Sequence, residues 1–151
     1  MSVVTRLSDM GIELPQAAAP VASYVPLMVL GRTVHISGQL PFVDGKLVSG
    51  KLGSDLGTER GKEAARACAL MILAQLEQAE LLDRVERIVK LNVFVASSPE
   101  FSDQPKVANG ASDLMVEVFG DAGKHARAAV GVAALPLGAA VEVDAIVALK
   151  A

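Results

Sequence analysis

The segment that most restricts the fold of this 151-residue chain is an apolar helix near its middle. Thr58 is a suitable N-cap residue, and helix-forming residues continue from there to about Glu80. The central sequence AARACALMILAQL, residues 64–76, is apolar on nearly every side of this helix. Such a helix has to be covered on more than one side, so we expect a sheet against one side and a neighbouring element against another.

Apolar stretches rich in Val and Ile on both sides of the helix predict the strands of that sheet. Three strands are expected at residues 24–30, 33–37 and 87–96. A second helix is expected at residues 103–120. Gly31-Arg32 between the first two strands indicates a hairpin. The closing sequence HARAAVGVAALPLGAAVEVDAIVALK, from His125 to Lys150, predicts a second hairpin around Pro136-Leu137.

The resulting order, β-β-α-β-α-β-β, is that of an α+β layered domain. Its length suits one domain over residues 1–151. Residues 1–23 contain Pro15 and Pro20 and predict an extended N-terminal arm with room for a short helical turn. Residues 45–57 are rich in glycine and predict a flexible loop. They lack the spacing of a phosphate-binding loop, so phosphate binding is not expected there.

Two charged residues interrupt the apolar closing hairpin, Arg127 in its first strand and Glu142 in its second. With a two-residue loop at Pro136-Leu137, alternation places both on the same face, with Ala129 and Gly131 leaving room between them. Their backbones would then be roughly 13 Å apart. Two interpretations remain open: a structural ion pair at a subunit contact, or a clamp in which the guanidinium binds a carboxylate and Glu142 orients water.

Composition excludes several classes of function. The net charge is −3 and no basic cluster is present, which disfavours nucleic-acid binding. The longest purely apolar run, Ala67–Ala74, is too short to span a bilayer. Apolar residues make up 52% of the chain, an excess that subunit contacts could bury. A single cysteine and no signal-peptide pattern predict a cytoplasmic protein.

The remaining reactive side chains carry weaker signals. Cys68 lies within the apolar helix and is best interpreted as a small packed residue. His35 shares a strand face with Ser37, and a structural histidine is favoured over a cleft residue. His125 is interpreted as a loop or surface residue. One cysteine and two distant histidines predict no metal site.

Several motifs resemble the Rid/YjgF family, also called reactive-intermediate deaminases and earlier described as endoribonucleases or translation inhibitors. Tyr24 is followed thirteen residues later by Ser37-Gly38-Gln39 and then by Pro41. Further motifs occur in the same order as in the family: Asn109, Arg127, Leu135-Pro136 and Val141-Glu142-Val143. The resemblance covers roughly residues 20–150 and indicates a divergent branch.

The resemblance implies a chorismate-mutase-like fold with helices on one face of the sheet, in a homotrimer with a central barrel and ligand sites between subunits. It implies hydrolysis of a 2-imino acid to a 2-keto acid and ammonia, with neither metal nor organic cofactor. Arg127 would clamp the substrate carboxylate, and Glu142 would hold or activate water. Four further residues would contact the substrate or line the cleft: Tyr24, Ser37, Asn109 and the main chain of Ala129.

One position departs from the family pattern, because many relatives have a cysteine where this chain has Ala129. If only the main-chain carbonyl at this position matters, alanine would serve. If the thiol takes part in the chemistry, the chain would hydrolyse another imine, or it would be a non-catalytic protein that binds small carboxylates in the same clefts. A third hypothesis, a ribonuclease with His35 and His125 as acid and base, is disfavoured by the acidic net charge and few aromatic residues.

Overall fold

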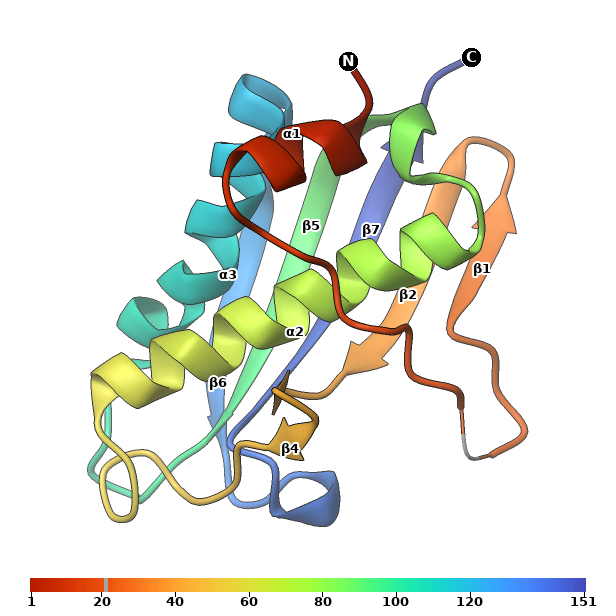
Figure 1. Ribbon diagram of the computed structural model, residues 1–151. Helices are drawn as coiled ribbons and strands as arrows, with labels where there is room; N and C mark the ends of the chain where they lie inside the picture. The colour runs from red at the N-terminus through yellow and green to blue at the C-terminus, as the bar shows by residue number, and fades with distance from the viewer. Residues whose placement is uncertain (21) are drawn as a thin grey trace.

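A computed structural model describes residues 1–20 and 22–151 as a five-stranded sheet with helices on one face (Figure 1). The order of strands across the sheet is β1-β2-β7-β5-β6. Their bounds are Leu27–Leu30 (β1), Thr33–Gln39 (β2), Val85–Ala96 (β5), Ala126–Val132 (β6) and Val141–Leu149 (β7). A separate small hairpin is formed by Phe42–Val43 (β3) and Lys46–Leu47 (β4). The α+β class is therefore confirmed, with the helices on one side of the sheet.

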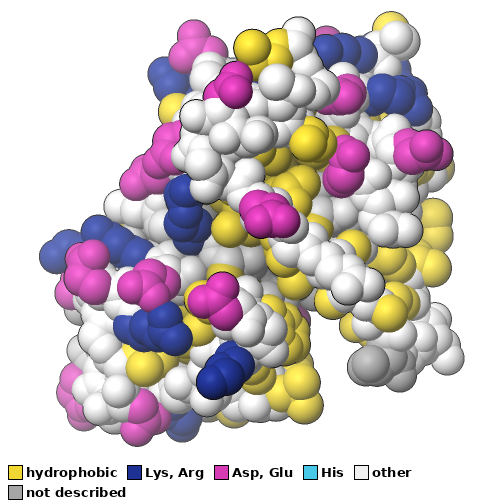
Figure 2. Space-filling model, viewed as in Figure 1, with side chains coloured by type: hydrophobic (Ala, Val, Ile, Leu, Met, Phe, Trp, Pro, Cys, Tyr) yellow, Lys and Arg dark blue, Asp and Glu magenta, His cyan; other side chains and the backbone are white. Residues whose placement is uncertain are grey.

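The helices are Val3–Asp9 (α1), Thr58–Gln78 (α2) and Gln104–Phe119 (α3), with short 3₁₀ turns at Leu82–Arg84, Gly120–Gly123 and Pro136–Gly138. The apolar helix α2 is enclosed as expected, because it packs on β2 and β7 and also against α3. Gly57 rather than Thr58 is its N-cap. Charged side chains lie scattered over this helical side of the molecule (Figure 2).

The N-terminal arm contains helix α1, of 7 residues, within the segment of residues 1–23 where the sequence left room for a short helical turn. Ser2 caps α1, since its hydroxyl oxygen accepts a hydrogen bond from the Thr5 amide at 3.1 Å. Val3 and Leu7 are buried, and the Val3 amide donates to Asp83 Oδ1 at 2.7 Å. The arm is therefore a packed part of the domain, although Val21 within it lies outside the described residues.

The first hairpin is confirmed, with Leu30 opposite Thr33 across a turn at Gly31, whose φ of 62° suits glycine. The expected closing hairpin is wrong. Strand β6 pairs in parallel with β5, and β5 also pairs with β7, so β5 lies between the two strands that were expected to be partners. Adjacent strands are only about 4.8 Å apart, so the loop between β6 and β7 is long enough to pass over one strand.

Side chains that alternate toward the helices form the core. On β7 these are Val141, Val143, Ala145, Val147 and Leu149, all buried. They lie with Leu91 and Val93 of β5 in one apolar cluster with residues of α2 and α3. The other face of the sheet, called the open face below, is covered by none of the described helices.

Candidate functional site

Arg127 lies on the edge strand β6, and its side chain reaches α3. Its Nη1 donates to Asn109 Oδ1 at 2.8 Å and to Ser112 Oγ at 3.2 Å. The Arg127 side chain is nevertheless exposed, and among the described residues its hydrogen bonds come from Nη1 only. The guanidinium is thus held at one nitrogen and accessible at the others, which suits the binding of an anion.

His125 lies in the loop before β6, as expected, and extends this cluster. Its Nε2 lies 2.8 Å from Ser112 Oγ, and its Nδ1 lies 2.6 Å from the Gly123 carbonyl oxygen. Sequence reasoning did not single out Ser112. The sequence did contain a signal for Ser112, because it follows Asn109 by three residues on the same helix, and residues with this spacing are neighbours on a helix surface.

The room expected beside Ala129 and Gly131 is filled. Both residues share the helix-side face of β6 with Arg127, and Ala129 packs against the core. A Cβ atom on Gly131 would lie 2.7 Å from Gln104 Nε2 and 3.2 Å from Ser97 Oγ. The side chains of α3 and of the loop before it therefore occupy this face, so no floor for a ligand exists there within the described residues of one chain.

Glu142 lies on the opposite face of the sheet from Arg127, which corrects the expected register. Arg127 aligns with Leu91, and Leu91 aligns with Ala145 of β7. Since residues that align across a sheet share a face, Glu142, three positions from Ala145, lies on the open face. Gly131 aligns through Val95 with Val141, whereas the expected two-residue loop would have paired it with Glu142, and a shift of one residue moves a side chain to the other face.

The Glu142 side chain is closely packed and partly shielded from solvent. A Cβ atom on Gly38 would lie 2.6 Å from Glu142 Oε1, so any larger residue at position 38 would clash with the carboxylate in its present position. Burial, and secondly the neighbouring Asp144 carboxylate, raise the pKa of Glu142 above the ordinary value of 4.5. Asp144 is itself held by Asn92, whose Nδ2 donates to Asp144 Oδ1 at 2.8 Å.

Ser37 lies on the open face of β2, next to Gly38, whose added Cβ atom would touch the Glu142 carboxylate. Ser37 Oγ donates to the Val25 carbonyl oxygen at 2.7 Å, and the Ser37 amide donates to the Pro26 carbonyl oxygen at 2.9 Å. These two bonds place the segment that begins with Tyr24 beside β2. Tyr24 is 50% exposed. His35 shares the open face of β2 with Ser37, as expected, and is exposed.

The six residues expected at the site therefore form two groups within one chain. The edge group is Arg127, Asn109 and Ala129, at α3 and β6. The open-face group is Ser37 and Glu142, together with Tyr24 in the segment held beside β2. Strands β7 and β5 lie between Ser37 on β2 and the edge strand β6, and Glu142 on β7 is separated from β6 by β5 and by its position on the other face, so one chain keeps the groups apart.

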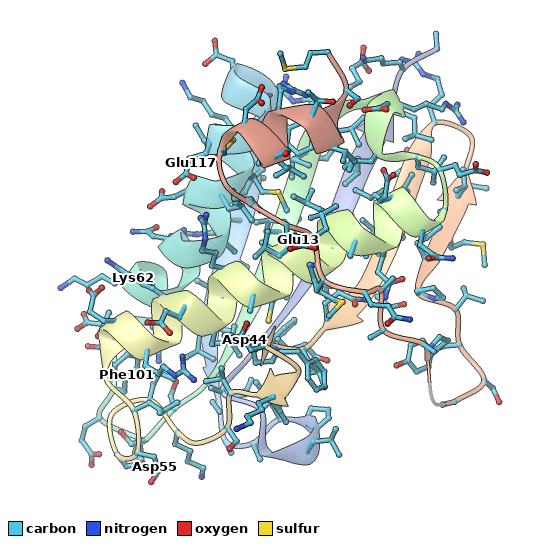
Figure 3. The ribbon with its side chains drawn as sticks, viewed as in Figure 1. Glu13, Asp44, Asp55, Lys62, Phe101 and Glu117 are labelled. Carbon is cyan, nitrogen blue, oxygen red and sulfur yellow. The ribbon has the colours of Figure 1, made fainter. Side chains whose placement is uncertain are left out.

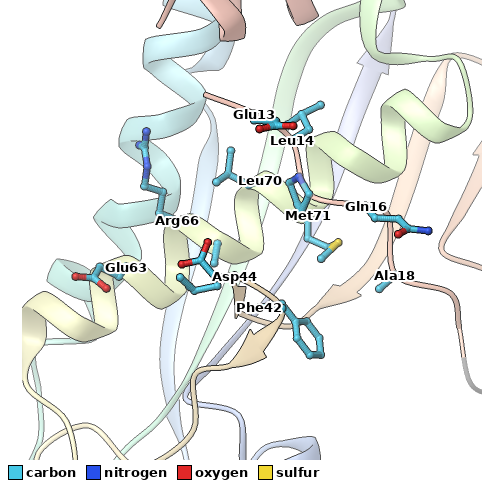
Figure 4. Close-up of a pocket in the computed structure, with 14 residues that line it drawn as sticks. Glu13, Leu14, Gln16, Ala18, Phe42, Asp44, Glu63, Arg66, Leu70 and Met71 are labelled. Carbon is cyan, nitrogen blue, oxygen red and sulfur yellow. The ribbon is translucent and has the colours of Figure 1, made fainter. Parts of the chain in front are cut away.

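A cavity of about 720 Å³ lies elsewhere, between α2, the N-terminal arm and the β3–β4 hairpin (Figure 4). Glu13 on the arm and Asp44 at the hairpin turn lie on either side of α2 (Figure 3). Leu70 and Met71 of α2 form part of the apolar floor. None of the six expected site residues lines this cavity.

Cys68 is a packed thiol, as its position in the apolar helix predicted. It is fully buried, its Sγ lies 3.7 Å from the Val141 carbonyl oxygen, and burial raises its pKa well above the ordinary value. Within residues 1–20 and 22–151, no group of three or more His, Cys, Asp or Glu residues is arranged to hold a metal ion. No helix in the same part of the chain is long and apolar enough to cross a membrane.

Comparisons with known proteins give a consistent result. Residues 4–149 match the family model described as "YjgF/chorismate_mutase-like, putative endoribonuclease". The chain is 57% identical to Protein TCP17 of Trypanosoma cruzi, over 98% of this chain and 94% of that protein. It is 30% identical to a 2-iminobutanoate/2-iminopropanoate deaminase of Dermatophagoides farinae, over 92% and 95% respectively. The crystal structure of Atu1372 from Agrobacterium tumefaciens, described as of unknown function, matches with a TM-score of 0.89 and 45% identity, over 99% of this chain and 92% of that one.

Proposed function

The chain belongs to the YjgF/chorismate-mutase-like family, and we propose that it hydrolyses imines or enamines of small 2-amino acids in clefts between subunits. The observation that carries this proposal is Arg127, a guanidinium anchored on α3 by Nη1 and exposed at its other nitrogens. A planar guanidinium matches a carboxylate with two parallel hydrogen bonds. The relative from Dermatophagoides farinae, named as an iminobutanoate and iminopropanoate deaminase, supports a substrate of this size.

The reaction needs only water and a group that moves a proton. The oxygen of water adds to the carbon of the N-protonated imine while the Glu142 carboxylate accepts a proton from that water, which gives a neutral carbinolamine. Glu142 returns this proton to the carbinolamine nitrogen, and the C–N bond breaks as the hydroxyl oxygen forms the C=O bond and gives its own proton to the Glu142 carboxylate. The released ammonia takes up that proton and leaves as ammonium, so that the 2-keto acid remains and Glu142 is again a carboxylate. The raised pKa of Glu142 suits this role, because a group that titrates closer to neutral pH both accepts and donates a proton readily.

The separation of the two residue groups supports a site shared by two chains. The edge group would come from one subunit and the open-face group from another, so that Arg127 and Glu142 face the same substrate. We propose the homotrimer with a central barrel as the assembly. The main chain of Ala129 would contact the substrate nitrogen or the attacking water, and Tyr24, Ser37 and Asn109 would complete the cleft.

The expected partners are small carboxylates and copies of the same chain, rather than membranes or nucleic acids. The net charge of −3 disfavours a polyanionic partner. A reducing compartment such as the cytoplasm suits a protein whose single cysteine, Cys68, is a buried free thiol. A ribonuclease is disfavoured further, because His125 is hydrogen-bonded at both ring nitrogens beside α3, whereas His35 lies on the open face of β2.

A non-catalytic carboxylate-binding protein is the second candidate, and Ala129 is the observation that favours it. If the thiol found at this position in many relatives is needed for hydrolysis, the chain would bind the same acids without converting them. The two candidates differ only in turnover, so a single experiment with two readouts separates them.

The test supplies 2-iminobutanoate and 2-iminopropanoate from an amino-acid oxidase and measures ammonia release above the spontaneous rate. We expect acceleration by the wild type and its loss in Arg127→Ala, because the carboxylate anchor is removed. The matched control is Arg60→Ala, an exposed arginine that pairs with Glu63 on α2 and should retain the full rate. Binding of 2-ketobutyrate is measured in parallel by calorimetry.

Binding without acceleration would reject hydrolysis and favour the carboxylate-binding protein. A wild type that neither binds 2-ketobutyrate nor accelerates the release of ammonia would contradict both candidates. Equal rates for Arg127→Ala and the wild type would remove Arg127 from the site.

A further inference from the structure

We infer that Ser112 and His125 are positioning residues for Arg127, which hold its guanidinium so that a ligand carboxylate is bound through Nε and Nη2. The inference rests on the proposed role of Arg127 as the carboxylate anchor. It concerns residues outside the six expected at the site. The structure joins them to Arg127 in one continuous chain of hydrogen bonds.

The first step is the occupation of Nη1. A guanidinium carries five N–H groups, two on each terminal nitrogen and one on Nε. Both hydrogens of Nη1 have acceptors, Asn109 Oδ1 at 2.8 Å and Ser112 Oγ at 3.2 Å. A carboxylate therefore cannot form the end-on pair that uses Nη1 and Nη2 without displacing a protein group. The side-on pair through Nε and Nη2 is the bidentate arrangement that remains.

The second step is the direction of the hydrogen bonds at His125. The Gly123 carbonyl oxygen, 2.6 Å from Nδ1, can only accept, so Nδ1 carries a hydrogen. In the neutral ring Nε2 is then an acceptor, and it lies 2.8 Å from Ser112 Oγ. The Ser112 hydroxyl therefore donates to His125, and its oxygen lone pairs are left to accept from Arg127.

The third step is the consequence for Arg127. Ser112 without His125 could rotate its hydroxyl hydrogen toward the guanidinium, where it would repel Nη1 instead of accepting from it. His125 prevents this rotation by binding that hydrogen, so the two residues act as one unit. Because Arg127 lies exposed on an edge strand, these bonds to α3 replace the packing that would orient a buried arginine.

The experiment compares Ser112→Ala, Ser112→Thr and His125→Phe with the wild type. The readouts are the dissociation constant of 2-ketobutyrate and the separate kcat and KM for 2-iminobutanoate. Loss of one hydrogen bond to a charged group corresponds to about a tenfold weaker affinity. We expect Ser112→Ala and His125→Phe to raise both the dissociation constant and KM about tenfold, with kcat nearly unchanged. Ser112→Thr retains the hydroxyl and should restore binding.

The double variant Ser112→Ala/His125→Phe tests whether the residues form one unit. We expect it to bind no more weakly than the weaker single variant, since both substitutions remove the same support. The matched control is Ser54→Ala, an exposed serine in the loop before α2, which should leave the dissociation constant unchanged. Urea unfolding of each variant reports whether the fold is retained.

Several outcomes would overturn the inference. A dissociation constant for Ser112→Ala equal to that of the wild type would show that Arg127 needs no such support. Weak binding by Ser112→Thr, or fully additive losses in the double variant, would also contradict it. Wild-type binding without turnover rejects only hydrolysis, and the dissociation constants still decide the inference. Absence of binding by the wild type contradicts both the inference and the proposed function.

Discussion

Among the candidate site residues, Glu142 is the one whose pKa the fold shifts clearly. It stands half-buried on an open sheet face, with Gly38 packed against its carboxylate and Asp144 two residues away. Both burial and the Asp144 charge raise its pKa. The neutral form is therefore favoured in the folded protein relative to the unfolded chain, and the charged form is a local cost to stability.

This predicts that Glu142→Gln raises the free energy of unfolding in a pH-dependent way. Because the pKa of Glu142 is higher in the folded protein than in the unfolded chain, where it is near 4.5, protonation of Glu142 stabilises the folded protein at low pH. This contribution to stability is lost as the pH rises through the pKa of the folded protein. The substituted amide stays neutral, so the variant should equal the wild type at pH 4 and exceed it at pH 7.5, by about 0.5 kcal/mol after allowance for solvent screening. Urea midpoints at one protein concentration measure the difference.

Asp144→Asn provides the control for this prediction. It removes the second cause of the raised pKa, so the gain from Glu142→Gln at pH 7.5 should be smaller in that background. A gain that does not change between pH 4 and pH 7.5 would show that Glu142 is not destabilised by its charge.

The helices α2 and α3 meet at a close crossing that glycine makes possible. A Cβ atom on Gly110 of α3 would overlap the Lys62 carbonyl oxygen of α2. On α2, a Cβ atom on Gly61 would lie 2.8 Å from Val107 Cγ2. The two backbones therefore approach directly, which lets both helices cover one face of the sheet and places Asn109 and Ser112 beside Arg127.

Gly110→Ala should accordingly destabilise the protein. Alanine improves helix propensity by about 1 kcal/mol over glycine, but the overlap is with backbone, which cannot move aside as a side chain can. Overpacking of this kind costs about 1–3 kcal/mol, and we expect a net loss at the upper end of that range. Asp113→Ala, at an exposed position on the same helix, should be neutral or slightly stabilising. Unchanged thermal stability of Gly110→Ala would contradict the close crossing.

At the scale of the whole molecule, the open face of the sheet is unusually apolar for a surface. A sheet packed on one face normally carries polar residues on the other. Here Met28 is 58% exposed, Leu30 75% and Val130 45%, and the register places all three on the open face. Large exposed apolar surfaces mark contacts with other molecules, so we propose that the central barrel of the trimer buries this face between subunits.

We therefore predict a trimer of 15.6 kDa chains in light scattering at micromolar concentration. Val130→Asp should weaken assembly, because it introduces a charge into a surface that would lose its water. Val4→Asp, on the exposed side of α1, is the matched control and should remain trimeric. A wild type that is monomeric under these conditions, or a Val130→Asp variant that assembles like the wild type, would contradict the proposed use of the open face.

Local pattern was enough to predict most individual elements. The apolar sequence of residues 64–76 identified α2 and its coverage on more than one side, and Gly31 marked the first hairpin. The motif that contains Ser37, and the order of Arg127 and Glu142, indicated the family that the comparisons then showed. The helix and the hairpin depend on residues close together in the chain, where propensity and periodicity act directly, whereas the family was indicated by the order of motifs along the whole chain.

What the sequence alone determined was the two long helices and the five strands of the main sheet, the buried face of most of them, and the family. Only the tertiary structure decided that β5 lies between β6 and β7, that Arg127 and Glu142 lie on opposite faces, and that Ser112 lies between His125 and Arg127 in one chain of hydrogen bonds. The physical reason is that strand pairing and side-chain contacts join residues distant in the chain. A short loop fits either a hairpin or a crossing over one strand, so only the packing of the whole sheet selects between them.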